Sequence, residues 1–151
     1  MQPSLRQAIA RIDIMEGGRS TGHGTGCLIA PDLVVTALHV VANRAVSPPA
    51  LLPGTIVLTF PGQRSEATVV DGRWDPQSDW VLLRCATPPP GVRPVPLADT
   101  AVDGDEWETF GFPAANSRDG LAQLGTIENA SGTFEGVAAY QLFSRQAAAG
   151  M

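Results

Sequence analysis

One histidine of this chain lies where it could do acid–base chemistry. His39 is in the string TALHV, residues 36–40, directly after the apolar run GTGCLIAPDLVV. A histidine that follows an apolar strand is, taken alone, most often a structural residue. Histidine is also the side chain that changes charge near neutral pH, so it serves as a general base for hydroxyl nucleophiles. The other histidine, His23, is expected to lie in a surface loop without a catalytic role.

A carboxylate is the natural companion of a histidine base, and Asp79 is the best candidate. It directly precedes the apolar run WVLLRCA, whereas Asp71 and Asp75 do not precede a hydrophobic strand. An aspartate before a strand is by itself an ordinary turn residue. A carboxylate that accepts a hydrogen bond from one imidazole nitrogen, however, holds the ring in the tautomer that leaves the other nitrogen free to take a proton.

Short strands separated by turns must position these side chains. A helical turn leading into a strand is expected within 4–15, a Gly-rich loop at 16–22, and one helical turn at 37–42, which the polar pair Asn43-Arg44 ends. The other strands by residue 86 are expected at 23–30, 33–36, 55–61, 65–74 and 79–86. Six short strands at this spacing predict a small β-barrel or sandwich.

A Pro-dense stretch, TPPPGVRPVPL, interrupts the strand pattern. Because proline cannot donate hydrogen bonds within a sheet, this stretch is the best candidate for a linker. Three further strands are expected after it, at 105–113, 120–130 and 136–144. We therefore divide the chain into a barrel at 1–86, a linker at 87–98 and the first part of a second barrel at 99–151.

Composition excludes several classes of function. The chain has 151 residues, 44% of them hydrophobic, and a net charge of −5 without any lysine. This argues against nucleic acid or an anionic membrane as a partner. The N-terminus lacks the apolar core of a signal peptide, which predicts a cytoplasmic protein. Cys27 and Cys85 are expected to be separate reduced thiols, with a disulfide between them as the alternative if a signal peptide has been removed. The residue spacing predicts no metal or cofactor.

The strand, turn, strand and TALHVV string together resemble the trypsin-like serine proteases of the chymotrypsin fold, in particular bacterial members without a zymogen step. Under this resemblance, His39 matches the catalytic histidine, and Asp79 in SDWVLLR matches the catalytic aspartate. The string ETFGFP resembles the first strand of their second barrel, with Gly111 and Pro113 at matching positions. The resemblance implies an all-β, chymotrypsin-like double barrel whose first barrel is complete and whose second is partly present.

The resemblance also implies which residues are still needed. These proteases carry their nucleophile in Gly-x-Ser-Gly; Gly150 matches the glycine that contributes to the oxyanion hole, and Met151 matches the variable residue, so the serine would follow. The first wall of the substrate pocket would be Gln146, Ala147, Ala148 and Ala149. We therefore expect a serine endopeptidase acting on peptides or proteins. The 151-residue chain would be inactive alone and would need a C-terminal continuation or a complementing chain.

Two alternatives stay open. A pseudo-protease module could bind peptides or partner proteins through its sheet edges without catalysis. The chain could also be a regulatory protease domain of a larger protein. Control by zymogen cleavage is not expected, because ARIDIMEGG lacks the Arg-Ile-Val-Gly-Gly cleavage site. An open second sheet exposes unpaired backbone groups, so we expect the isolated chain to self-associate.

Overall fold

The computed structural model describes residues 3–98, 100–113, 119–134 and 137–144. Within them strands are the predominant secondary structure, as predicted, and there are two helices of four residues each. The elements in chain order are α1 (Pro3–Arg6), β1 (Ile9–Glu16), β2 (Arg19–Ala30), β3 (Leu33–Thr36), α2 (Leu38–Val41), β4 (Ala42–Asn43), β5 (Ala50–Leu51), β6 (Thr55–Phe60), β7 (Gln63–Asp75), β8 (Trp80–Cys85), β9 (Glu106–Gly111), β10 (Leu121–Phe134) and β11 (Val137–Ser144). Neither helix could cross a membrane, and this holds for the described residues only.

Six antiparallel strands close into a barrel in the order β1-β2-β3-β8-β7-β6. The pairing of β1 with β6, in which Ile12 lies opposite Leu58, closes the ring. Alternate residues of each strand face inward, as Val81, Leu83 and Cys85 do on β8. Burial of these apolar side chains is the main favourable term for the barrel.

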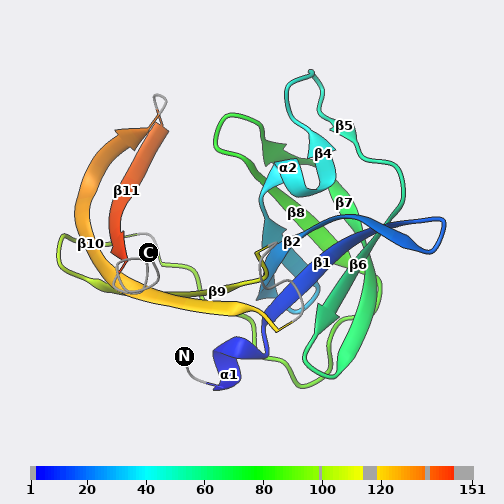
Figure 1. Cartoon of the computed structure of the whole chain (residues 1–151), viewed down its shortest axis with the longest axis horizontal. Coiled ribbons are helices and arrows are strands. Elements are labelled where there is room, and N and C mark those ends of the chain that lie inside the picture. The colour runs from blue at the N-terminus through cyan, green and yellow to red at the C-terminus, as the bar shows by residue number, and fades with distance from the viewer. Residues whose placement is uncertain (1–2, 99, 114–118, 135–136, 145–151) are drawn as a thin grey trace.

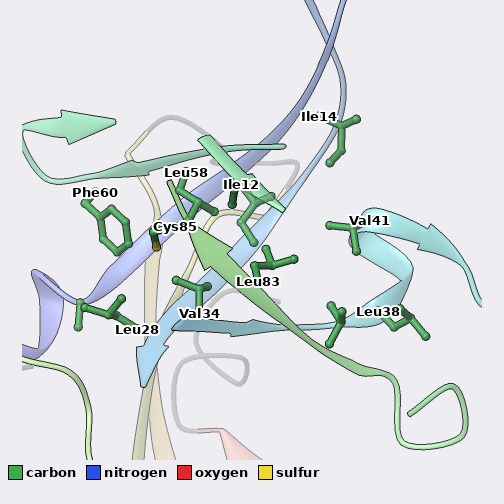
Figure 2. Packing of buried hydrophobic residues seen from close by; sticks show 14 of the residues in the cluster. Ile12, Ile14, Leu28, Val34, Leu38, Val41, Leu58, Phe60, Leu83 and Cys85 are labelled. Carbon is green, nitrogen blue, oxygen red and sulfur yellow. The ribbon is translucent and has the colours of Figure 1, made fainter. Parts of the chain in front are cut away.

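The core of the barrel extends up to the helix that carries His39. Figure 2 shows apolar side chains of β1, β2, β3, β6 and β8 meeting inside the barrel, while Leu38 and Val41 of α2 lie toward one end of the cluster. Leu38 is fully buried and Val41 is 1% exposed. The apolar residues of TALHVV therefore fix α2 to the barrel, while His39 faces outward.

A second sheet lies beside the barrel, with the strand order β11-β10-β9 (Figure 1). Residues 87–98 lead to it without any helix or strand. They run along the barrel, because the Val95 amide donates to the Leu28 carbonyl at 2.8 Å. Val92 and Val95 also pack against the barrel core.

The second sheet is joined to the barrel by polar contacts around Thr25 of β2. The Phe112 amide, just after β9, donates to the Thr25 hydroxyl at 2.8 Å. Within the barrel, the Thr25 carbonyl accepts a hydrogen bond from the Thr36 hydroxyl at 2.7 Å. On the N-terminal side, the Arg6 guanidinium lies 4.1 Å from the Phe110 ring centroid and 5.3 Å from that of Phe112. These distances are in the range of cation–π interactions.

Two local expectations differ from the structure. The loop expected at 16–22 is only a two-residue turn, Gly17-Gly18, with φ values of 59° and 78°. Because two successive residues with positive φ make a tight hairpin turn, Glu16 pairs directly with Arg19 and β2 begins there. His23 is therefore exposed on a strand and not in a loop. The short β4–β5 ribbon was not predicted, because two-residue strands leave no alternating pattern.

Gly24 of β2 lets α2 approach the barrel. A Cβ atom at this position would lie 2.7 Å from both γ-carbons of Val40, the residue after His39. A valine side chain has little rotational freedom to move away, so the contact has to be relieved by a shift of α2. The absence of a side chain at residue 24 is thus one condition for the position of His39.

This close approach makes a prediction for a matched pair of variants. We expect G24A to lower the free energy of unfolding by about 1–3 kcal/mol, the usual cost of overpacking. G22A lies on the same strand, and its Cβ would be 3.7 Å from the nearest atom of Ile14, an ordinary contact. We expect G22A to change stability by less than about 0.5 kcal/mol. Urea unfolding measures both values, and equal effects of the two variants would contradict the packing argument.

Candidate active site

His39 is presented to solvent by a helix of a single turn. β3 ends at Thr36, which is 6% exposed, and α2 begins at Leu38 after the extended N-cap Ala37. The N-cap residue Ala37 makes no side-chain hydrogen bond to α2, but the Leu38 amide donates to the Asp79 carbonyl at 3.2 Å. The His39 side chain keeps 65% of its surface exposed, so its ring is accessible to a reacting group.

Asp79 holds His39 at two points. His39 Nδ1 lies 2.6 Å from Asp79 Oδ2, and the His39 backbone amide donates to Asp79 Oδ1 at 2.9 Å. An ionised carboxylate can only accept hydrogen bonds, so Nδ1 carries the proton. In the neutral ring Nε2 then has the free lone pair. This is the arrangement that a general base requires, and it brings together two residues that are 40 positions apart in the chain.

Asp79 has an unusual backbone conformation. Its φ is 57°, and no other residue except glycine has a positive φ in the part of the chain that the structure describes. The preceding turn is held by Asp75, whose Oδ1 accepts hydrogen bonds from the amides of Gln77 at 2.9 Å and Ser78 at 3.3 Å. Aspartate tolerates the left-handed region better than most residues, and such strained positions cluster at functional sites.

The surroundings of Asp79 favour its ionised form. Burial alone would raise the pKa of Asp79, since its side chain is only 21% exposed. The hydrogen bonds from the His39 ring and backbone, and the charges of His39 and Arg44, outweigh this effect. The pKa of Asp79 therefore lies below its ordinary value of 3.8. The carboxylate is negative in the whole range in which it would have to stabilise an imidazolium.

Sequence reasoning missed Arg44. The Arg44 Nε atom lies 3.9 Å from Asp79 Oδ1, and Nη1 donates to the Pro76 carbonyl at 3.0 Å. In the sequence this residue is only part of a polar pair that ends a helical turn. Its approach to Asp79 depends on the path of the chain after β4, for which the sequence carries no periodic signal.

The other candidate residues lie apart from this pair. His23 pairs across the sheet with Asp13 of β1 and is exposed. Cys27 and Cys85 are both free cysteines. Burial raises the pKa of both thiols, and the charge of Asp32 adds to the effect at Cys85. This agrees with reduced, unreactive side chains.

Gly150 and the proposed pocket wall, Gln146, Ala147, Ala148 and Ala149, lie outside the described residues. Among the residues that are described, no group of histidine, cysteine, aspartate and glutamate side chains could hold a metal ion.

Comparison with known proteins gives a consistent picture. Residues 24–151 match the family described as trypsin-like peptidase domain. No protein with a curated description matches the sequence. Among solved structures, the chain is similar to the active form of the Rv3671c protease from M. tuberculosis, with 25% identity and a TM-score of 0.61 over 94% of this chain and 60% of that one.

Two other structures extend the comparison. The inactive form of an Rv3671c mutant from M. tuberculosis H37Rv is 22% identical, with a TM-score of 0.57 over 94% of this chain and 63% of that chain. Deg5 is 19% identical, with a TM-score of 0.65 over 93% of this chain and 69% of that one. The chain thus spans less than two thirds of the length of both Rv3671c chains. The predicted chymotrypsin-like fold, with one closed barrel and part of a second, is confirmed.

The lowered pKa of Asp79 makes a prediction for stability in acid. A carboxylate whose pKa is depressed in the folded state contributes stability above its unfolded value, and this contribution disappears as the pH falls through the folded value. Near neutral pH, we expect the free energy of unfolding of the wild-type protein to exceed that of D79N by an amount that does not depend on pH. Below pH 3.8, we expect this difference to shrink as the pH falls. Urea unfolding at a series of pH values measures the difference.

The control for this experiment is D71N, which removes one negative charge from an exposed position of β7. We expect D71N to follow the acid-induced decline of the wild-type protein. If the wild type and D79N instead declined in parallel, Asp79 would not be stabilised by its partners in the folded state.

Proposed function

Because this chain belongs to the family of trypsin-like peptidase domains, we propose that it supplies the base and the orienting acid of a serine endopeptidase. The observation that carries this proposal is the two-point contact between His39 and Asp79, with Nδ1 2.6 Å from Oδ2. In the proposed reaction the nucleophile needs access only to Nε2, the ring nitrogen on the side away from Asp79.

The proposed reaction follows from the roles of the two side chains. His39 Nε2 would take the proton of a serine hydroxyl as the oxygen attacks the carbonyl carbon of a peptide bond. The imidazolium that forms would be stabilised by the Asp79 carboxylate, and Nε2 would then return the proton to the leaving amine. The negative carbonyl oxygen would accept hydrogen bonds from backbone amides, to which Gly150 is proposed to contribute.

The serine itself is proposed to come from a Gly-x-Ser-Gly segment, either encoded after residue 151 or on a complementing chain. The second sheet supports this arrangement, because β9 and β11 each have one neighbouring strand in the sheet as described. Unpaired strand edges are positions at which further strands can add. The proposed substrate is a peptide or protein, and Gln146, Ala147, Ala148 and Ala149 are the proposed first wall of its pocket.

The test combines the chain with a segment that carries Gly-x-Ser-Gly and measures hydrolysis of peptide and ester substrates. We expect no His39-dependent hydrolysis by the 151-residue chain alone and clear hydrolysis by the combination. H39A should abolish this activity, and D79N should reduce turnover by about 10⁴, as loss of that carboxylate does in trypsin-like proteases. H23N is the matched control, because His23 is exposed on β2 and has no part in the proposed reaction.

Two outcomes would contradict the proposal. His39-dependent hydrolysis by the 151-residue chain alone would mean that the nucleophile lies within it. A combination that is folded and binds peptides but hydrolyses none of them would favour the non-catalytic peptide-binding module.

A further inference from the structure

Arg44 connects two loops that meet at the His39–Asp79 pair. It follows the short strand β4, five residues after His39, and its side chain is 41% exposed. One end of its guanidinium, Nη1, donates to the Pro76 carbonyl at 3.0 Å. Its Nε atom lies 3.9 Å from Asp79 Oδ1. A single side chain thus contacts both the start and the end of the turn at residues 76–79.

This turn determines where the Asp79 carboxylate lies. Within the turn, the Asp75 carboxylate accepts hydrogen bonds from the Gln77 and Ser78 amides. It ends in the left-handed conformation of Asp79. A strained residue keeps its conformation only when the surrounding contacts fix it. The hydrogen bond of Arg44 to Pro76 ties the start of this turn to the segment after α2.

The charge of Arg44 acts on the same carboxylate. The salt bridges of Asp79 in the described part of the chain are with His39 of α2 and with Arg44. Asp75 at the end of β7 is the other charged group of this turn, and the turn amides occupy its Oδ1. At 3.9 Å the guanidinium stabilises the ionised form of Asp79, although partial exposure weakens the effect.

We propose that Arg44 is a positioning residue of the His39–Asp79 pair, whose guanidinium holds the 76–79 turn in place through the Pro76 carbonyl and faces the Asp79 carboxylate with its charge. Only a guanidinium can perform both tasks at once, because its separate nitrogens can donate to the turn and face the carboxylate together. The ammonium group of lysine is a single point charge that could face Asp79 without holding Pro76. The importance of this role for catalysis rests on the proposed protease function, whereas the geometry does not.

The test uses R44Q and R44K in the 151-residue chain, with R64Q as the matched control. Arg64 is exposed near the start of β7, at the opposite end of this strand from the turn, so R64Q makes the same change in net charge. The first measurement is the titration midpoint of the Asp79 carboxyl carbon by NMR. We expect R44Q to raise this midpoint by about 0.2–0.7 pH unit, the range of a partly exposed ion pair, and R44K and R64Q to leave it near the wild-type value.

The second measurement is hydrogen exchange of the Gln77 and Ser78 amides, which reports how firmly the turn is held. We expect faster exchange in both R44Q and R44K and unchanged exchange in R64Q. A midpoint that does not move in R44Q, or that moves equally in R64Q, would overturn the charge role. Exchange that stays unchanged in R44K would overturn the positioning role.

If R44Q does not fold, R44K alone still tests the proposal. The proposal requires that R44K combine a wild-type titration midpoint of Asp79 with faster exchange of the Gln77 and Ser78 amides. Neither measurement needs the serine. A folded combination of the chain with a Gly-x-Ser-Gly segment that lacks protease activity would therefore refute the proposed function and leave this result intact, while a failure here would leave the proposed function standing.

Discussion

The pairing of β3 with β8 is the constraint on which the candidate site depends. Thr36 at the end of β3 lies opposite Val81 near the start of β8. His39 follows the first of these residues by three positions, and Asp79 precedes the second by two. Antiparallel neighbours bring such residues to the same end of a sheet, and barrel closure removes the freedom of either strand to slide. The 2.6 Å contact between His39 and Asp79 is a consequence of this register.

The strand register brings His39 and Asp79 together, and the packing around α2 then fixes the orientation of the His39 ring. Leu38 and Val41 point into the core, while Val40 lies against Gly24. A one-turn helix has little stability of its own, since helix nucleation is unfavourable. Its position must therefore come from the burial of neighbouring side chains and from the bond between the Leu38 amide and the Asp79 carbonyl. The exposed His39 ring is therefore held by the half-buried Asp79 and by the buried side chains of Leu38 and Val41.

The sequence was sufficient to predict what depends on alternation and on local motifs. The barrel strands occur where apolar residues stand at every second position, and His39 and Asp79 lie next to apolar runs that anchor them. Three features of the structure could not be predicted from the sequence. The Gly17-Gly18 turn is shorter than its glycine content suggested, the β4–β5 ribbon has no periodicity, and the return of Arg44 to Asp79 is a tertiary contact. Each of these depends on the path of a loop, which no residue pattern encodes by itself.

The contact between Phe112 and Thr25 has a consequence for the order of folding. It joins residues 87 positions apart, whereas His39 and Asp79 are separated by 40. Closing the longer loop costs more chain entropy, and non-local contacts of this kind slow folding. The histidine and its aspartate can therefore be aligned within the barrel while the second sheet is still unattached. In a chain that folds in this order, the His39–Asp79 pair is already in place when the second sheet docks on the barrel.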